Sequence, residues 1–143
     1  MRYDEFIHTV MRNGKLDSFE KAEQIVDAFL QTLGQNFYGP DRDGLAAQLP
    51  DGLKAPLSKR EYKGHSLEQF YITMGARADV GYPEAVKQAR AVVAALKQAV
   101  APGQLEKVQS VLPSEFQELF KGETTEPLSP TAEGLSKAEE DQT

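Results

Sequence analysis

Cysteine is absent from this chain of 143 residues, and so is tryptophan. Without cysteine the chain has no disulfide, no thiolate nucleophile and no cysteine-ligated zinc or iron–sulfur site, which fits a reducing compartment. The two histidines, His8 and His65, are too far apart in sequence to begin a short HExxH-type metal motif. The sequence therefore predicts no metal site and no cofactor-binding residue.

Long apolar runs are also absent. The most apolar stretch, residues 89–100, is interrupted by Arg90, Lys97 and Gln98, whereas a helix that spans a bilayer needs roughly 20 continuous apolar residues. The first residues are charged and carry no signal-peptide pattern. We therefore predict no membrane contact and a cytoplasmic location.

The net charge of −6 is unevenly distributed along the chain. Residues 122–143 hold six acids and one base, whereas residues 1–121 hold 15 lysines and arginines against 16 acids. The strong basic excess typical of nucleic-acid-binding domains is missing, which disfavours nucleic acid as a partner. The segment 122–143 has no aromatic residue and two prolines, so we expect a disordered acidic tail.

An internal repeat organises residues 1–121, which we predict to be one helical domain. A leucine–proline pair followed by two apolar residues occurs twice, 63 residues apart: Leu49, Pro50, Leu53 and Leu57, then Leu112, Pro113, Phe116 and Phe120. Matching apolar positions continue upstream at an offset of 63, which becomes 64 before Ala22. This pattern predicts two homologous units, 3–57 and 67–120, joined by a short basic linker, 58–66.

Each unit has helical periodicity and almost no strand signal. One apolar stripe runs through Ala22, Ile25, Val26, Phe29, Leu30, Leu33 and Phe37, and the second unit repeats it with Ala85, Ala89, Val92, Val93, Leu96 and Val100. Asp17 and Ser66 are predicted N-caps, and Pro83 suits a first helical turn. We predict an all-α, pseudo-twofold helical bundle of two units with about four helices each, followed by the tail.

Several segments resemble one bacterial family: YDEFIHTVMRNG at the start, EKAEQIVDAFLQTLGQ, GLAAQLPDGL, EAVKQARAVVAALKQAV and SVLPSEFQELF. Together they make the chain similar, over about residues 3–121, to the domain of unknown function 2267. The resemblance implies an all-α protein and supplies no activity, cofactor or catalytic residue. The second unit departs from the first in having SVLP in place of AQLP, so any role of this glutamine belongs to Gln48 alone.

Motifs for catalysis are not found. The chain contains no GxSxG elbow and no glycine-rich phosphate loop, and the segment Asp41-Arg42-Asp43-Gly44 lacks the spacing of a calcium loop. We expect Asp41 and Asp43 to stabilise a helix start instead. His8 is expected to be structural or exposed. The sequence predicts no catalytic residue and a protein that is not an enzyme.

Two sets of residues are candidates for binding. The first is a basic cluster in and beside the linker, which suits an anion, a nucleic-acid backbone or the acidic tail, or is simply a solvated loop: Lys54, Lys59, Arg60, Tyr62, Lys63 and His65. The second set either closes the core or forms an apolar surface for a partner or a second copy: Phe116, Leu119 and Phe120. The same alternatives apply to Phe37 and Tyr38 at a helix end. His65 is expected to be a loop histidine.

These observations predict a non-catalytic interaction or regulatory module with an unknown protein partner or a homo-oligomeric state. The alternative is a small-molecule-binding protein that holds an apolar ligand between the two units, since pockets form between the helices of bundles.

Overall fold

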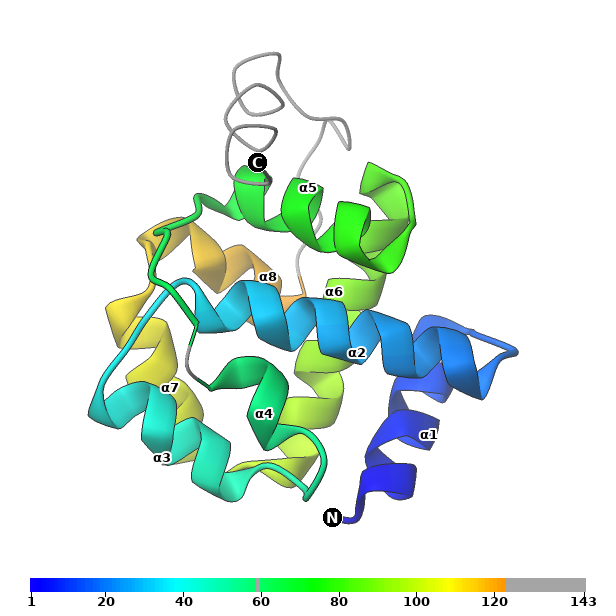
Figure 1. Cartoon of the computed structure of the whole chain (residues 1–143), viewed down its shortest axis with the longest axis horizontal. Helices are drawn as coiled ribbons and strands as arrows, with labels where there is room; N and C mark the ends of the chain where they lie inside the picture. Colours follow the sequence, from blue (N-terminus) through cyan, green and yellow to red (C-terminus); the bar gives the residue numbers. More distant parts are fainter. Residues whose placement is uncertain (59, 123–143) are drawn as a thin grey trace.

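The computed structural model describes residues 1–58 and 60–122, and its regular elements there are all helical (Figure 1). In chain order they are α1 (Tyr3–Gly14), α2 (Phe19–Gly34), α3 (Pro40–Gln48), α4 (Lys54–Leu57), α5 (Leu67–Ala78), α6 (Tyr82–Ala99), α7 (Pro102–Val111), a 3-10 turn (Ser114–Phe116) and α8 (Gln117–Lys121). This confirms the all-α prediction. The predicted tail, from residue 123 onward, lies outside the described residues.

We call α1–α4 and α5–α8 the two halves of the described chain. The first helix of each half ends in the same way. Helix α1 buries Phe6, Ile7 and Val10 on one face and is followed by Lys15, whose φ is 54°. Helix α5 is followed by Asp79, whose φ is 56°. Within the described residues these are the non-glycine positions with positive φ. A left-handed residue after a helix turns the chain sharply and lets its N–H bond the last carbonyls, so each first helix folds back beside the second.

The helix starts agree with the sequence except at one residue. Ser66 caps α5 in a capping box with Gln69, as predicted, through two hydrogen bonds of 3.1 Å. Pro83 lies in the first turn of α6, also as predicted. The prediction of Asp17 as the cap of α2 was wrong: Ser18 Oγ accepts from Lys21 N at 3.1 Å, because the hydroxyl one residue later is in reach of the free N–H groups.

Helix α2 is shorter than its apolar stripe predicts. The stripe continues to Phe37, but α2 ends at Gly34 and Phe37 is buried in the loop that follows. Gln35, Asn36 and Phe37 are all buried there. The apolar pattern predicted a helix that is too long, because Phe37 is buried by contact with the rest of the fold and not by lying on a helix.

The short helices α3 and α7 pack against each other. Gln104 Nε2 donates to the Asp41 carbonyl at 3.3 Å, and Gln48 Oε1 accepts from Ala101 N at 2.8 Å, just before α7 begins. Gln48 therefore supplies an acceptor to the start of α7. Asp41 and Asp43 lie in the first turn of α3, as expected for anions near a helix start.

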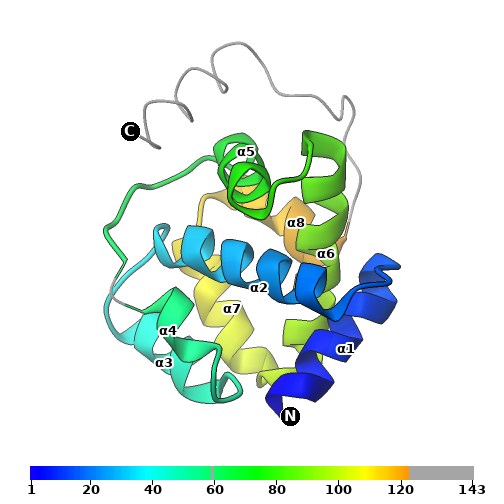
Figure 2. The same cartoon turned by 45° about the vertical axis from the view of Figure 1, so that its right-hand side comes forward.

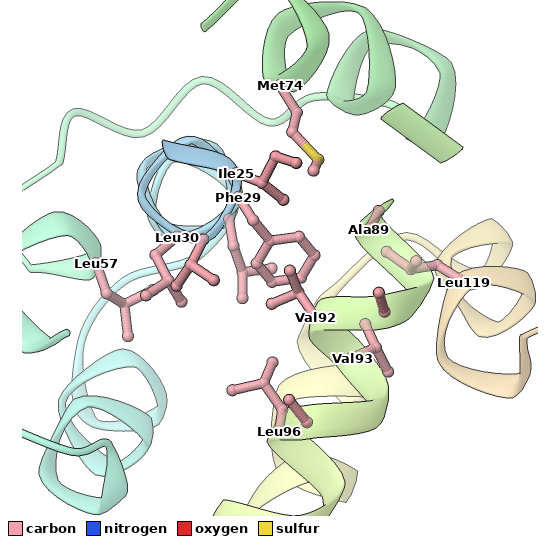
Figure 3. Packing of buried hydrophobic residues seen from close by; sticks show 14 of the residues in the cluster. Ile25, Phe29, Leu30, Leu57, Met74, Ala89, Val92, Val93, Leu96 and Leu119 are labelled. Atoms are coloured by element: carbon pink, nitrogen blue, oxygen red, sulfur yellow. The ribbon is translucent and has the colours of Figure 1, made fainter. Parts of the chain in front are cut away.

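Helices α2 and α6 form the centre of the fold. The first helix of each half packs on the central helix of the other half: α1 on α6, and α5 on α2 (Figures 1 and 2). Side chains from α2, α5, α6 and α8 meet in one cluster, where Phe29 faces Val92 and Met74 comes from above (Figure 3). Phe70 lies in its aromatic part, edge-on to Phe29 and Phe116. Helices α1–α4 and α5–α8 therefore contribute to a single core.

No helix among the described residues is long and apolar enough to cross a membrane.

Candidate interaction surface at the linker

The linker is held against the end of α2. Both Lys63 N and Gly64 N donate to the Gln35 carbonyl, at 2.7 and 3.1 Å. Gly64 has a φ of +67°, which lets the chain turn onto this carbonyl at little steric cost. The linker backbone is thus fixed to residues that directly follow α2.

Asn36 forms a reciprocal pair with the backbone of His65. Its Nδ2 donates to the His65 carbonyl at 2.9 Å, and its Oδ1 accepts from His65 N at 2.7 Å. The His65 ring lies inside as well, 1% exposed, with Nε2 3.2 Å from Gln35 Oε1. His65 lies in a loop, as predicted, but it is buried and therefore does not belong to an exposed anion-binding surface. The linker folds inward at this point, where Gln35, Asn36 and His65 bind one another.

Arg42 ties a third segment to the linker. Its Nη1 donates to the Gly34 carbonyl at 3.0 Å and to the Arg60 carbonyl at 2.9 Å. Arg60 is half-buried, and its Nε donates to the Pro56 carbonyl at 2.8 Å. These arginines therefore bind backbone carbonyls of the protein itself.

The described cations of the predicted basic cluster each have a partner within the protein. Lys54 pairs with Asp51 at 3.6 Å, and Lys63 with Glu61 at 3.8 Å. Arg60 and His65 are occupied as described above, and Lys59 lies outside the described residues. The neighbouring acids and the inward course of the linker reduce its attraction for an external anion.

The linker instead displays an aromatic pair. Tyr62 is 55% exposed and Tyr38, from the loop before α3, is 67% exposed. Their rings pack edge-on with centroids 5.4 Å apart. The sequence placed Tyr62 in the basic candidate surface and named Tyr38, with Phe37, as a residue that closes the core or faces a partner; it did not predict that the two tyrosines meet. We call Tyr38 and Tyr62 the tyrosine pair.

The three apolar residues of the last helical segment are buried and form no exposed surface. Phe116, Leu119 and Phe120 are 1%, 0% and 2% exposed, and Leu119 points at α6 between Ala89 and Val93 (Figure 3). The expectation of an exposed apolar partner or dimer surface is therefore corrected in favour of core closure. The 3-10 turn and α8 place all three side chains on the inner side of the last segment.

Two grooves lie beside α1. One, of about 410 Å³, is lined by Asn13 from α1 and by α6 residues: Pro83, Val86, Lys87, Arg90, Ala91 and Ala94. The other, of about 430 Å³, has the lining Met1, Glu5, His8, Thr9, Arg12 and Gln98. His8 is exposed and its ring packs on Phe19. Within residues 1–58 and 60–122, no three metal-ligating side chains converge.

Three tyrosines have pKa values shifted well above the usual range. Burial raises the pKa of Tyr82 to about 12 and also raises the pKa of Tyr71. Burial, and then a hydrogen bond to Glu23, raise the pKa of Tyr3 to about 12. These three phenols are protonated at neutral pH, the opposite of what a tyrosine base or nucleophile requires.

Replacing Asn36 by alanine is expected to lower the free energy of unfolding by about 2 kcal/mol, because it leaves the buried N–H and carbonyl of His65 without their partners. Hydrogen exchange at Lys63 and Gly64, measured by NMR, should accelerate in N36A more than at Lys97 in α6. The control is Asn13→Ala, which removes a more exposed amide. Equal protection of the linker in wild type and N36A would contradict the role given to Asn36.

Comparison with known families identifies one family over most of the chain. The model of a family described as Uncharacterized conserved protein (DUF2267) matches residues 3–119, from the start of α1 into α8. No curated protein matches the chain.

Proposed function

The chain belongs to the DUF2267 family, and we propose that it is a non-catalytic interaction or regulatory module that contacts a protein partner through the tyrosine pair. The observation that carries this proposal is the exposure of two packed aromatic rings, 67% and 55%, over a backbone held by buried hydrogen bonds.

Tyrosine suits this role because it offers a large contact area and a hydroxyl at a low cost in side-chain entropy, and it is enriched among residues that dominate binding energies. The backbone beneath Tyr62 is fixed through Lys63, Gly64 and His65 to the end of α2. A surface ordered before binding loses less entropy when it binds. Glu61 and Lys63 beside the ring supply a polar rim.

Two further parts of the proposal concern catalysis and location. A non-catalytic role agrees with the protonated tyrosines and with the lack of a catalytic motif in the sequence. A cytoplasmic location agrees with the cysteine-free composition.

We also infer that the two halves arose from one duplicated unit with pseudo-twofold symmetry. The helix order is alike in both halves, and the turn residues Lys15 and Asp79 are 64 positions apart. The reciprocal packing of α1 on α6 and of α5 on α2 supports the same inference.

Nothing in the described residues favours the alternative of an apolar ligand between the halves. Phe29, Val92 and Met74 meet in that region (Figure 3), and the two grooves described above lie at the surface beside α1.

Site-specific crosslinking inside the source cell tests the proposal. A photoreactive phenylalanine analogue at position 38 or 62 should give an adduct of discrete mass, and the same analogue at Val111, 45% exposed on α7, should not. Tyr62→Ser should weaken the adduct formed from position 38. An adduct of twice the chain mass would identify a second copy as the partner. Equal adducts from positions 62 and 111, or none from either tyrosine position, would contradict the proposal.

A further inference from the structure

The groove between Asn13 and α6 has an apolar floor and a cationic rim. Pro83, Val86, Ala91 and Ala94 supply the apolar part, and Asn13 Nδ2 donates to the Ala91 carbonyl at 3.3 Å, joining the end of α1 to α6. The charged residues of the lining are Lys87 and Arg90. Such a groove suits a segment that combines acids with small apolar side chains.

Lys87 is available to an external acid. Its side chain is exposed, and among the described residues it takes part in no ion pair. The nearest acid on the same helix, Glu84, accepts from Gln88 Nε2 at 2.8 Å. Lys15, which follows α1, is exposed beside Asn13 in sequence and adds a further positive charge at this end of α1.

The chain leaves the described fold beside the helix that forms this groove. Helix α8 packs on α6, and Lys97 of α6 donates through Nζ to the Phe120 carbonyl. The described part of the chain therefore ends, at Gly122, just after a helix that packs on α6.

We propose that the segment 123–143 of the same chain binds in the groove between Asn13 and α6. It carries six acids and one base, the charge complementary to Lys87 and Arg90. The segment also carries apolar residues at intervals of three or four positions: Leu128, Ala132, Leu135 and Ala138. These side chains are of a size that can pack against the alanines and the valine of the groove.

The reach of this segment does not limit the docking. Twenty-one residues span up to about 70 Å when extended, whereas the 18 residues of α6 extend about 27 Å. Because the segment is tethered, its effective concentration near the groove is on the order of millimolar, so individually weak contacts suffice. Docking occupies the groove with the chain's own acids, and an acidic partner protein must displace them.

The linker is the weaker docking site for the same segment. Lys54 and Lys63 each have an acidic neighbour within ion-pair distance, and His65 is buried. The cation at the groove, Lys87, has no such neighbour in the described part of the chain.

Paramagnetic relaxation in the full-length chain tests this docking. Because the chain has no cysteine, Ser136→Cys creates a single attachment point for a nitroxide label. The amides of Asn13, Lys87 and Ala91 should lose most of their NMR intensity, and those of α7 should lose little. The intensities should recover at about 1 M salt, where the Debye length is only about 3 Å.

Matched charge reversals locate the contact. In the labelled chain, Lys87→Glu should restore much of the intensity at the groove, whereas Lys107→Glu, the same change at an exposed position on α7, should not. Both variants change surface side chains, so the amide spectrum should remain that of the folded protein.

Three outcomes would overturn the proposal. Intensity losses centred on residues 60–65 would place the segment at the linker, and uniform losses would show no docking. Chains that carry the nitroxide can also be mixed with isotope-enriched chains that lack it. Intensity losses in the isotope-enriched chains would show that the occupant of the groove comes from a second copy.

Discussion

Replacing Phe70 by alanine is expected to lower the free energy of unfolding by about 3–5 kcal/mol, the range for removing a fully buried phenylalanine. Phe70 is 0% exposed, and its ring packs edge-on against Phe29 at 5.4 Å and Phe116 at 5.6 Å. It joins α5 to α2 and to the 3-10 turn, so the cavity opens where both halves meet. A loss of this size is a large fraction of the 5–15 kcal/mol that stabilises a typical domain.

Urea unfolding followed by circular dichroism measures this effect. The control is Tyr38→Ala, which removes an exposed aromatic ring and should change the free energy of unfolding by no more than about 0.5 kcal/mol. The two variants also separate stability from binding, since only Tyr38→Ala removes part of the proposed partner surface. Similar unfolding midpoints for F70A and Y38A would refute the central position of Phe70 in the core.

The second large effect is expected at Gly34, the last residue of α2. A Cβ at this position would lie 2.3 Å from the Leu57 carbonyl oxygen and 3.0 Å from Arg60 Cγ. The carbonyl belongs to the end of α4 and cannot rotate away as a side chain does, so α4 must move or the backbone must strain. We expect Gly34→Ala to cost about 3 kcal/mol, at the upper end for inserting a methyl group into a packed site.

Gly103→Ala is the matched control. Gly103 lies in the first turn of α7, and a Cβ there meets no atom within 4 Å. The same change should therefore stabilise the protein by up to about 1 kcal/mol, because alanine has the higher helix propensity. Thermal melts of the two variants should shift in opposite directions. A G34A melting temperature equal to or above that of wild type would mean that α4 is not seated against α2.

Part of the candidate surface followed from the sequence. Tyr62 was recognisable because it interrupts a run of charged linker residues, and a solvated linker exposes its side chains. Tyr38 was named only together with Phe37, with core closure and a partner surface both open. Its exposure, in contrast to the burial of Phe37, depends on the chain leaving α2 at Gly34 and turning at Gly39. The inward position of His65 was equally hidden, since it depends on Asn36, which is 29 residues away in sequence.

The sequence by itself determined the helical class, the main breaks and most helix starts. These are set locally: a 3.6-residue apolar period, a capping serine or a proline acts within a few residues of its own position. The tertiary structure alone decided which side chains are covered. Phe116, Leu119 and Phe120 form the same apolar pattern whether they close a core or face a partner, and only the contact of α8 with α6 distinguishes the two. The linker divides in the same way. The acids that pair with Lys54 and Lys63 are two or three residues away in sequence, whereas the burial of His65 and the contact of Arg42 with the Arg60 carbonyl depend on the fold.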